Sequence, residues 1–277
     1  MPELPEVEVT RRGISPALLG RRISSVIVRQ PRLRYPIPDD LPALLTGKRI
    51  DSISRRAKYL LLELQRGSVL IHLGMSGSLR VVPATQPAVA HEHVDLICDD
   101  IALRLRDPRR FGALLWLPHP ASAHPLLASL GIEPLDERFD DLWLHRLCAG
   151  RRTPIKQLIM DAHHLVGVGN IYASESLFRA RIHPQTPAGR LSAARCKALA
   201  NAIQATLNDA LAAGGSSLRD FVHSDGSSGY FQQQYFVYGR DGEPCRLCNT
   251  PVRRLTLGQR ASFFCPRCQR APSGSPR

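Results

Sequence analysis

Hydrophobic residues in the first part of the chain recur in short runs that are separated by Gly, Pro and Asp. The clearest runs begin at Ile23, Tyr59, Ser68 and Ala113. Short apolar runs between turn residues are typical of antiparallel β-sandwiches. Residues 5–19 precede these runs with a helical spacing of apolar residues, and Gly20 is a helix stop signal. We therefore expect an N-terminal helix and a β-sandwich within residues 1–120.

The spacing of apolar residues changes after a proline-rich passage at 117–125, which is typical of a linker. Apolar residues then recur every three or four positions at 139–147 and at 192–213, as in amphipathic helices. Thr153-Pro154 favours a further helix start, because Thr is a good cap and Pro suits the first helical position. The sequence thus predicts an α+β protein with a helical domain at 135–225.

Two C-x-x-C pairs near the C-terminus form the strongest local motif. Sixteen residues separate Cys245 and Cys248 from Cys265 and Cys268, within the spacing of four-cysteine zinc sites. A pair of redox motifs is the less favoured alternative. Two β-prone segments between the pairs predict a hairpin that turns at Gly258-Gln259. We expect a zinc finger at 235–270, and a disordered tail at 271–277 that is rich in Pro, Ser and Gly.

The charge balance narrows the class of partner. Of 277 residues, 37 are Lys or Arg and 24 are Asp or Glu, which gives a formal net charge of +13. Such an excess favours a polyanionic partner over small acidic metabolites. No apolar run reaches the length of a membrane span, and the acidic N-terminus does not resemble a signal peptide. We expect a cytoplasmic protein in which Cys98, Cys148 and Cys196 are ordinary buried residues.

The first residues suggest amine chemistry. A small second residue usually permits removal of Met1, and Pro2 would then carry an exposed secondary amine. An α-amine titrates near 8, so more of it is unprotonated at neutral pH than of a lysine. Such an amine can attack an anomeric carbon and form a Schiff base. Glu3 and Glu6 are candidate proton donors or acceptors, although acidic residues here also suit a helix N-terminus.

Three motifs together resemble the bacterial formamidopyrimidine-DNA glycosylase family. They are Met1-Pro-Glu-Leu-Pro-Glu-Val-Glu8, Val166-Gly-Val-Gly-Asn-Ile-Tyr-Ala-Ser-Glu175 and the four-cysteine finger, and they occur in the family's order. The resemblance implies a β-sandwich, a helix-two-turns-helix domain and a finger with one structural zinc ion. It also implies a monomeric, bifunctional DNA glycosylase and AP lyase. Such an enzyme removes 8-oxoguanine and ring-opened purines from damaged double-stranded DNA by base excision.

The resemblance also implies the roles of individual residues. Pro2 would be the nucleophile and Glu3 its proton donor, while Lys58 and Arg260 would contact phosphates and take part in the eliminations. Met75, Arg109 and Phe111 would fill the space left by the extruded nucleotide, with Arg109 facing the orphaned cytosine. The remaining expected DNA contacts are His72, His91, Arg151, Lys156, Asn170 and Arg219, the last in a lesion-capping loop at 216–230.

Each of these residues also has a structural interpretation. Asn170 can be a helix cap after a glycine turn, Arg260 and Lys58 can be solvated charges, His72 can be a satisfied strand histidine, and Phe111 can belong to the core. Two other functions remain in view. One is an endonuclease VIII that prefers oxidised pyrimidines, and the other is a zinc-ribbon protein that binds DNA without catalysis. The Glu-Leu-Pro-Glu-Val-Glu segment favours the purine enzyme over endonuclease VIII.

Overall fold

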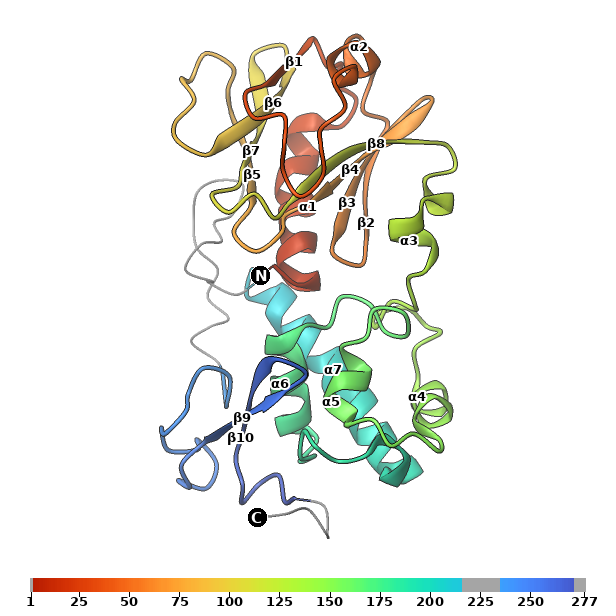
Figure 1. The fold of residues 1–277 in the computed structure, drawn as a ribbon, viewed down its shortest axis with the longest axis vertical. Coiled ribbons are helices and arrows are strands. Elements are labelled where there is room, and N and C mark those ends of the chain that lie inside the picture. The colour runs from red at the N-terminus through yellow and green to blue at the C-terminus, as the bar shows by residue number, and fades with distance from the viewer. Residues whose placement is uncertain (1, 216–234, 272–277) are drawn as a thin grey trace. The chain divides into compact units, whose positions relative to one another are not determined.

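The computed structural model describes residues 2–215 and 235–271, which belong to two compact units. Unit 1 comprises residues 2–129 with 211–215, and unit 2 comprises residues 130–210 with 235–271. Figure 1 shows the strands of unit 1 and the helices and finger of unit 2. The expected loop at 216–230, including Arg219, falls outside the described residues, as does the tail after Ala271.

Unit 1 contains two four-stranded sheets in which every neighbouring pair of strands is antiparallel. The first sheet has the order β1-β6-β7-β5 and the second has the order β2-β3-β4-β8. The strands are β1 (Ser25–Val28), β2 (Ser52–Arg56), β3 (Tyr59–Leu64), β4 (Gly67–His72), β5 (Ser78–Pro83), β6 (Glu92–Cys98), β7 (Ile101–Arg106) and β8 (Ala113–Pro118). The sandwich expected from the short apolar runs is therefore confirmed.

One hydrophobic core joins both sheets to the first helix, α1 (Leu4–Leu18). Val7, Ile14 and Leu18 lie on the buried side of α1 and pack in the same cluster as strand residues such as Leu60 and Leu103. A short helix, α2 (Leu41–Leu45), adds two further leucines to the cluster. Burial of this apolar side fixes α1, and therefore fixes the residues at its N-terminus.

The proline-rich passage is more ordered than a linker. It ends β8 and then forms a 3-10 turn, η1 (Ala121–Ala123), and a one-turn helix, α3 (Pro125–Ala128). Proline has no N–H to donate and a preset φ, so it suits the first residue of α3. The ring of His124 caps α3 by accepting a 3.3 Å hydrogen bond from the Leu126 N–H.

Unit 2 is helical and ends in a β-hairpin. Its helices are α4 (Asp141–Cys148), α5 (Ile155–Ile159), α6 (Asn170–Arg179) and the first part of α7 (Ala193–Ala212), with the 3-10 turn η2 (Ala188–Arg190). The helix expected after Thr153 begins at Ile155, and Pro154 is its N-cap residue without a side-chain cap. Among the described residues, no helix is long and apolar enough to cross a membrane.

The hairpin consists of β9 (Arg253–Leu257) and β10 (Arg260–Phe264). Gly258 and Gln259 both have positive φ, 51° and 61°, as a two-residue hairpin turn requires. Beneath the hairpin, Phe178 of α6 packs in a small core with Val237 and Val252. Gln269 also donates a 2.8 Å hydrogen bond to the carbonyl of Ile182. The finger is therefore packed on the helices of unit 2.

Candidate functional site

The N-terminus of α1 carries the proposed nucleophile and its acid. Glu3 is the N-cap residue of α1 and has an extended conformation. Its backbone N–H donates a 2.8 Å hydrogen bond to Oε2 of Glu6, and the Glu3 side chain accepts from the Glu6 N–H in return. This reciprocal capping box fixes Glu3 directly beside Pro2. The structural and the catalytic interpretations of these two acids are therefore compatible.

Pro2 is buried, whereas the sequence interpretation needs an exposed nitrogen. Glu3 and Glu6 are also buried, with exposed fractions of 2% and 0%. Gly215, just beyond α7, lies close by, since a Cβ built on it would be 3.5 Å from Cγ of Glu6. In a chain that keeps Met1, the Pro2 nitrogen is an amide nitrogen without nucleophilic character. Nucleophilic chemistry at Pro2 therefore requires removal of Met1.

Lys58 lies in the tight turn between β2 and β3. The turn has two residues, and Ala57 adopts a φ of 54° while its carbonyl accepts a 2.9 Å hydrogen bond from Arg55. His72, at the end of β4, pairs with Tyr59 across the sheet. Its ring accepts a 3.1 Å hydrogen bond from the Gly74 N–H. Burial lowers the pKa of His72 to about 4, and the positive charges of Lys58 and Arg34 lower it further. The ring is therefore neutral at pH 7.

Asp107 holds two loops of unit 1 together. Its Oδ2 accepts a 2.7 Å hydrogen bond from the Gly112 N–H, and its Oδ1 accepts a 3.3 Å bond from Ser76. Its backbone carbonyl lies 2.8 Å from Nε2 of His93. Because Asp107 is fully buried, these bonds fix the backbone on both sides of it.

The loops that Asp107 joins carry exposed apolar residues. Met75 is 40% exposed and Phe111 is 46% exposed. The guanidinium of Arg109 lies 4.8 Å from the centre of the Phe111 ring, in a cation–π contact. Exposed His91 is tied to the same loops, since its carbonyl accepts a 3.0 Å hydrogen bond from the Asp107 N–H. Phe111 is therefore not a core residue, and exposed apolar groups beside cations suit insertion between bases.

In unit 2, Asn170 begins α6 and binds the hairpin. Gly169, rather than Asn170, is the N-cap residue. The Asn170 amide donates a 2.9 Å hydrogen bond to the carbonyl of Ala261 and accepts a 2.7 Å bond from Nζ of Lys156. Lys156 also donates to Oγ of Ser262 at 2.7 Å. Lys156 is only 1% exposed, so this geometry favours positioning of Asn170 over direct DNA contact by Lys156.

Of the residues expected to contact DNA, Arg260 and Arg151 of unit 2 are open to solvent. Arg260 is the first residue of β10, beside the hairpin turn, and is exposed. With Lys156, Met160 and Leu257 it lines a cavity of about 200 Å³. Arg151 is also exposed, and its Nε donates a 2.7 Å hydrogen bond to the carbonyl of Leu147 at the end of α4. Both guanidiniums can therefore reach an anion outside the protein.

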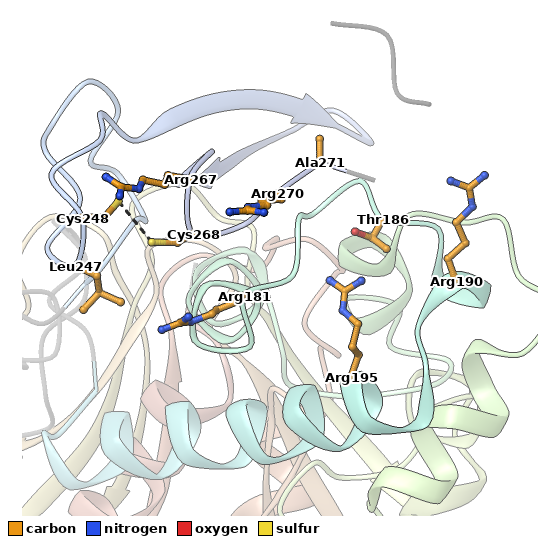
Figure 2. Close-up of a pocket in the computed structure, with 10 residues that line it drawn as sticks. All are labelled: Arg181, Thr186, Arg190, Arg195, Leu247, Cys248, Arg267, Cys268, Arg270 and Ala271. Atoms are coloured by element: carbon orange, nitrogen blue, oxygen red, sulfur yellow. Dashed lines mark hydrogen bonds between the residues drawn. The ribbon is translucent and has the colours of Figure 1, made fainter. Parts of the chain in front are cut away.

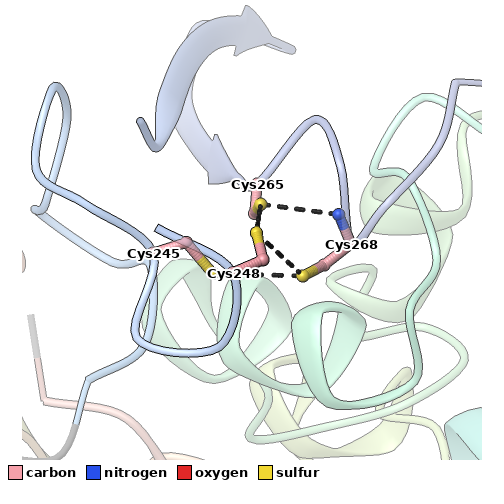
Figure 3. A group of neighbouring side chains, drawn as sticks. All are labelled: Cys245, Cys248, Cys265 and Cys268. Carbon is pink, nitrogen blue, oxygen red and sulfur yellow. Dashed lines mark hydrogen bonds between the residues drawn. The ribbon is translucent and has the colours of Figure 1, made fainter. Parts of the chain in front are cut away.

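The four cysteines of the finger meet in space, as Figure 3 shows. Their sulfur atoms all lie within 4.8 Å of one another, and three of the separations are 3.5, 3.6 and 4.0 Å. A tetrahedral zinc site with Zn–S bonds of about 2.3 Å places its sulfurs about 3.8 Å apart. Hydrogen bonds from Thr250 lower the pKa of Cys248 to about 6, whereas burial raises the pKa of Cys265 and raises that of Cys268 to about 12. The donor set therefore fits one zinc ion with no open coordination position.

Sequence profiles of known families cover most of the chain. Residues 1–114 match the formamidopyrimidine-DNA glycosylase N-terminal domain, residues 130–222 match the formamidopyrimidine-DNA glycosylase H2TH domain, and residues 242–271 match a zinc finger found in FPG and IleRS. The chain belongs to the formamidopyrimidine-DNA glycosylase (Fpg) family. This result confirms the resemblance, the three-part fold and the zinc finger expected from the sequence.

Curated relatives and solved structures agree with this assignment to the Fpg family. The chain is 61% identical over 270 residues to the formamidopyrimidine-DNA glycosylase of Aromatoleum aromaticum, with 98% of this chain and 100% of that protein covered. The formamidopyrimidine-DNA glycosylase of Cupriavidus pinatubonensis is 57% identical, with 97% of this chain and 100% of that protein covered.

Among solved structures, the MutM (Fpg) protein of Thermus thermophilus matches with a TM-score of 0.87 at 39% identity, covering 97% of this chain and 98% of that chain. Lactococcus lactis Fpg bound to Fapy-dG-containing DNA matches with a TM-score of 0.89 at 32% identity, covering 97% and 100%. The same protein bound to abasic-site DNA matches with a TM-score of 0.89 at 31% identity, covering 97% of this chain and 100% of that chain.

Sequence reasoning missed three residues that organise this Fpg-family site. Asp107 and Ser262 act through the contacts described above. Glu175 is 2% exposed and accepts hydrogen bonds of 2.8–3.0 Å from the N–H groups of residues 236–238, just before the finger. Glu175 stands in the quoted glycine motif, but its partners lie 61–63 residues further along, so only the fold identifies its role.

Proposed function

We propose that this chain is a bifunctional DNA glycosylase and AP lyase that excises oxidised purines from duplex DNA and then cleaves the strand. Its membership of the Fpg family across nearly the whole chain supports this function. The single observation that carries the chemistry is the capping box that fixes Glu3 beside Pro2. The Lactococcus relative has been seen with Fapy-dG-containing and with abasic-site DNA, which agrees with both halves of the activity.

The reaction begins at Pro2 once Met1 has been removed. The lone pair of the Pro2 nitrogen attacks C1′ of the damaged nucleotide, and the bond from C1′ to the base breaks with its electron pair passing to the base. The proton that the Pro2 nitrogen then releases neutralises the departing base. Glu3 donates a proton to the ring oxygen of the sugar, so that the ring opens and an iminium forms. Loss of a proton from C2′ then expels the 3′ phosphate, and a second elimination expels the 5′ phosphate. Water finally adds to the iminium, so that the bond from C1′ to the Pro2 nitrogen breaks and the amine is free again.

The other site residues hold the DNA during these steps. Lys58 at the β2–β3 turn and Arg260 at the hairpin turn bind phosphates beside the lesion, and Asn170 and Arg151 add phosphate contacts from unit 2. A zinc ion bound by the four cysteines would stabilise the finger that carries Arg260 and Ala261. If about six phosphates are bound, the logarithm of affinity falls with the logarithm of salt concentration at a slope of about −5.

Extrusion of the lesion leaves a gap in the duplex. Unstacking a base costs a few kcal/mol, which inserted side chains can offset. We assign this role to Met75 and Phe111, which are exposed, and to Arg109, whose stacking on Phe111 holds its guanidinium toward the orphaned cytosine. His72 and His91 contact the DNA backbone near the lesion.

We further propose that the enzyme works as a monomer on chromosomal DNA in the bacterial cytoplasm.

Borohydride trapping tests the chemistry. With an 8-oxoguanine duplex, borohydride should reduce the iminium to a stable adduct that mass spectrometry maps to Pro2. Pro2→Gly should trap far less, while Lys58→Met should still form the Pro2 adduct even if the strand is cleaved slowly. An adduct on a lysine, or active enzyme that retains Met1, contradicts the mechanism. Failure to trap any adduct with Pro2 as the free N-terminus favours a DNA-binding protein without catalysis.

Two duplexes separate the purine enzyme from the endonuclease VIII alternative. One carries 8-oxoguanine opposite cytosine and the other carries thymine glycol opposite adenine. We expect faster excision of 8-oxoguanine under single-turnover conditions. Faster excision of thymine glycol overturns the substrate class while leaving the Schiff-base chemistry intact.

A further inference from the structure

Five arginines surround one hollow on unit 2, shown in Figure 2. The hollow has a volume of about 760 Å³, and its lining includes no carboxylate among the described residues. We name it the arginine hollow, and its arginines are Arg181, Arg190, Arg195, Arg267 and Arg270. They come from separate places in the fold: the end of α6, the η2 turn, the start of α7 and the last residues of the finger.

Four of these arginines have no acidic partner among the described residues. Within the described part of the chain, Arg181, Arg195, Arg267 and Arg270 form no ion pair with a carboxylate, whereas Arg179 nearby pairs with Asp209 at 2.6 Å. Grouping guanidiniums in this way without counter-charges disfavours the folded state through repulsion. Such a cost is consistent with an anion that binds from outside.

The zinc-bound thiolates of the finger would neutralise only part of this positive charge. Cys248 and Cys268 line the hollow, and four thiolates around a zinc ion carry two net negative charges. The four guanidiniums without an ion pair among the described residues exceed that charge, so an excess of about two positive charges remains for an external ligand. That excess equals the charge of two neighbouring phosphodiesters in a nucleic-acid strand, each of which carries one negative charge.

The hollow lies beyond the opposite end of α6 from the phosphate contact proposed at Asn170, although its Arg190 follows Gly189, whose N–H donates a 2.8 Å hydrogen bond to the carbonyl of Arg151. Asn170 is the first residue of α6, and Arg181 lies two residues beyond its end at Arg179. At 1.5 Å per residue, the helix between Asn170 and Arg179 is about 14 Å long, and Arg181 lies beyond its end. Leu247 at the rim is 60% exposed, which offers an apolar contact to a sugar or a base. The arginine hollow therefore has both the charge and the apolar edge that nucleic-acid strands contact.

We propose that the arginine hollow binds the phosphates of a second DNA segment while the site at Asn170 and Arg260 holds the first. Arginine forks bind phosphate oxygens in pairs, and each phosphate held in this way raises the affinity without reading sequence. An enzyme with two such contacts passes directly from one duplex to another before it has fully released the first. This inference rests on the proposed function, because it takes DNA to be the ligand of the first site.

Direct transfer has a kinetic signature. Full-length enzyme is loaded on a labelled undamaged duplex and chased with increasing concentrations of unlabelled duplex. With a second DNA site, the release rate rises with chase concentration, by at least about threefold across the range. The double variant Arg181→Gln, Arg267→Gln should flatten this dependence. Arg146→Gln, which removes an exposed arginine of α4 outside the hollow, should keep it.

The outcomes separate the possible failures. Zinc content and thermal midpoint equal to wild type establish that the double variant is folded. A release rate of wild-type enzyme that is independent of chase concentration, or a double variant that transfers like wild type, overturns the second site while excision of 8-oxoguanine still supports the proposed function. If polyglutamate accelerates release as much as duplex DNA does, the hollow recognises acidic protein and the inference is wrong. No detectable binding of wild type to either damaged or undamaged duplex defeats the proposed function itself.

Discussion

Nζ of Lys156 lies 2.7 Å from Oδ1 of Asn170 and donates a hydrogen bond to it. The two side chains also bind neighbouring residues of the finger, since Asn170 donates to the carbonyl of Ala261 and Lys156 donates to Oγ of Ser262. A buried ammonium thus fixes the orientation of a partly exposed amide. The finger and the start of α6 are held as one surface, to which we assign phosphate binding.

Replacing Lys156 tests this arrangement. We expect Lys156→Met to lower the free energy of unfolding by about 2–4 kcal/mol, because buried oxygen acceptors lose their donor. Affinity for an abasic-analogue duplex should fall at least about tenfold as Asn170 loses its orientation. Lys197→Met removes the same charge from an exposed position on α7 and should have little effect on stability. Equal effects of both substitutions on stability and affinity contradict a positioning role for Lys156.

Asp107 should control the position of Arg109 and Phe111, to which we assign the gap left by the extruded lesion. In Asp107→Ala the buried N–H of Gly112 loses its acceptor, which costs about 1–3 kcal/mol of stability. The loop that carries Arg109 and Phe111 then loses its fixed geometry, so excision of 8-oxoguanine opposite cytosine should slow. Asp39→Ala, at an exposed position of unit 1, is the control. Urea unfolding and single-turnover excision measure the two effects, and unchanged excision with lowered stability would show that Asp107 serves the fold alone.

His72 should make unit 1 less stable in acid. Its pKa is about 4 in the folded chain and 6.5 when unperturbed, so the unfolded chain takes up a proton first as the pH falls. The stability that the neutral ring contributes is complete above pH 6.5 and is lost progressively down to pH 4, by about 3 kcal/mol. Urea unfolding of wild type and His72→Gln between pH 7 and pH 4.5 should give converging curves. Parallel curves would show that His72 does not carry the effect, and His145→Gln on the surface of α4 should leave the wild-type profile intact.

The cysteine cluster should hold zinc and, through it, the hairpin. Zinc binding of this kind contributes about 10–16 kcal/mol to folding of a small finger. We expect Cys268→Ser to lose zinc, as measured by elemental analysis, and to lose DNA binding because Ala261 no longer meets Asn170. Cys98→Ala, in the core of unit 1, should retain one zinc ion per chain. Full zinc content in Cys268→Ser would contradict the ligand set.

Short sequence patterns predicted the helix α1 and the zinc finger, because the residues that determine each of them lie close together in the sequence. The cap and apolar side of α1 lie within one segment, and the two C-x-x-C pairs carry their own spacing. Lys156 shows where this reasoning ends. Beside Arg151 and Arg152 its charge indicates a solvated helix end, yet its partners are contributed by α6 and by the finger, 14 to 106 residues away. Only the tertiary fold reveals that this lysine is buried.

The same reasoning explains why the arginine hollow escaped sequence analysis. Its five arginines are spread from residue 181 to residue 270, and each one alone resembles an ordinary surface charge. Glu175 is a comparable case, since its carboxylate looks like a solvated helix residue until residues 236–238 are placed against it. The net charge of the sequence predicts a polyanionic partner. Which surface binds that partner depends on how the chain packs.

The long separation between Lys156 and Ser262 also bears on protein synthesis. The ribosome completes Lys156 more than a hundred residues before Ser262 leaves the exit tunnel, as their separation of 106 positions requires. A polypeptide that stops short of the finger therefore buries an ammonium without all of its acceptors, or leaves α5 unfolded. Prematurely terminated products should for this reason be poor DNA binders and good substrates for proteolysis.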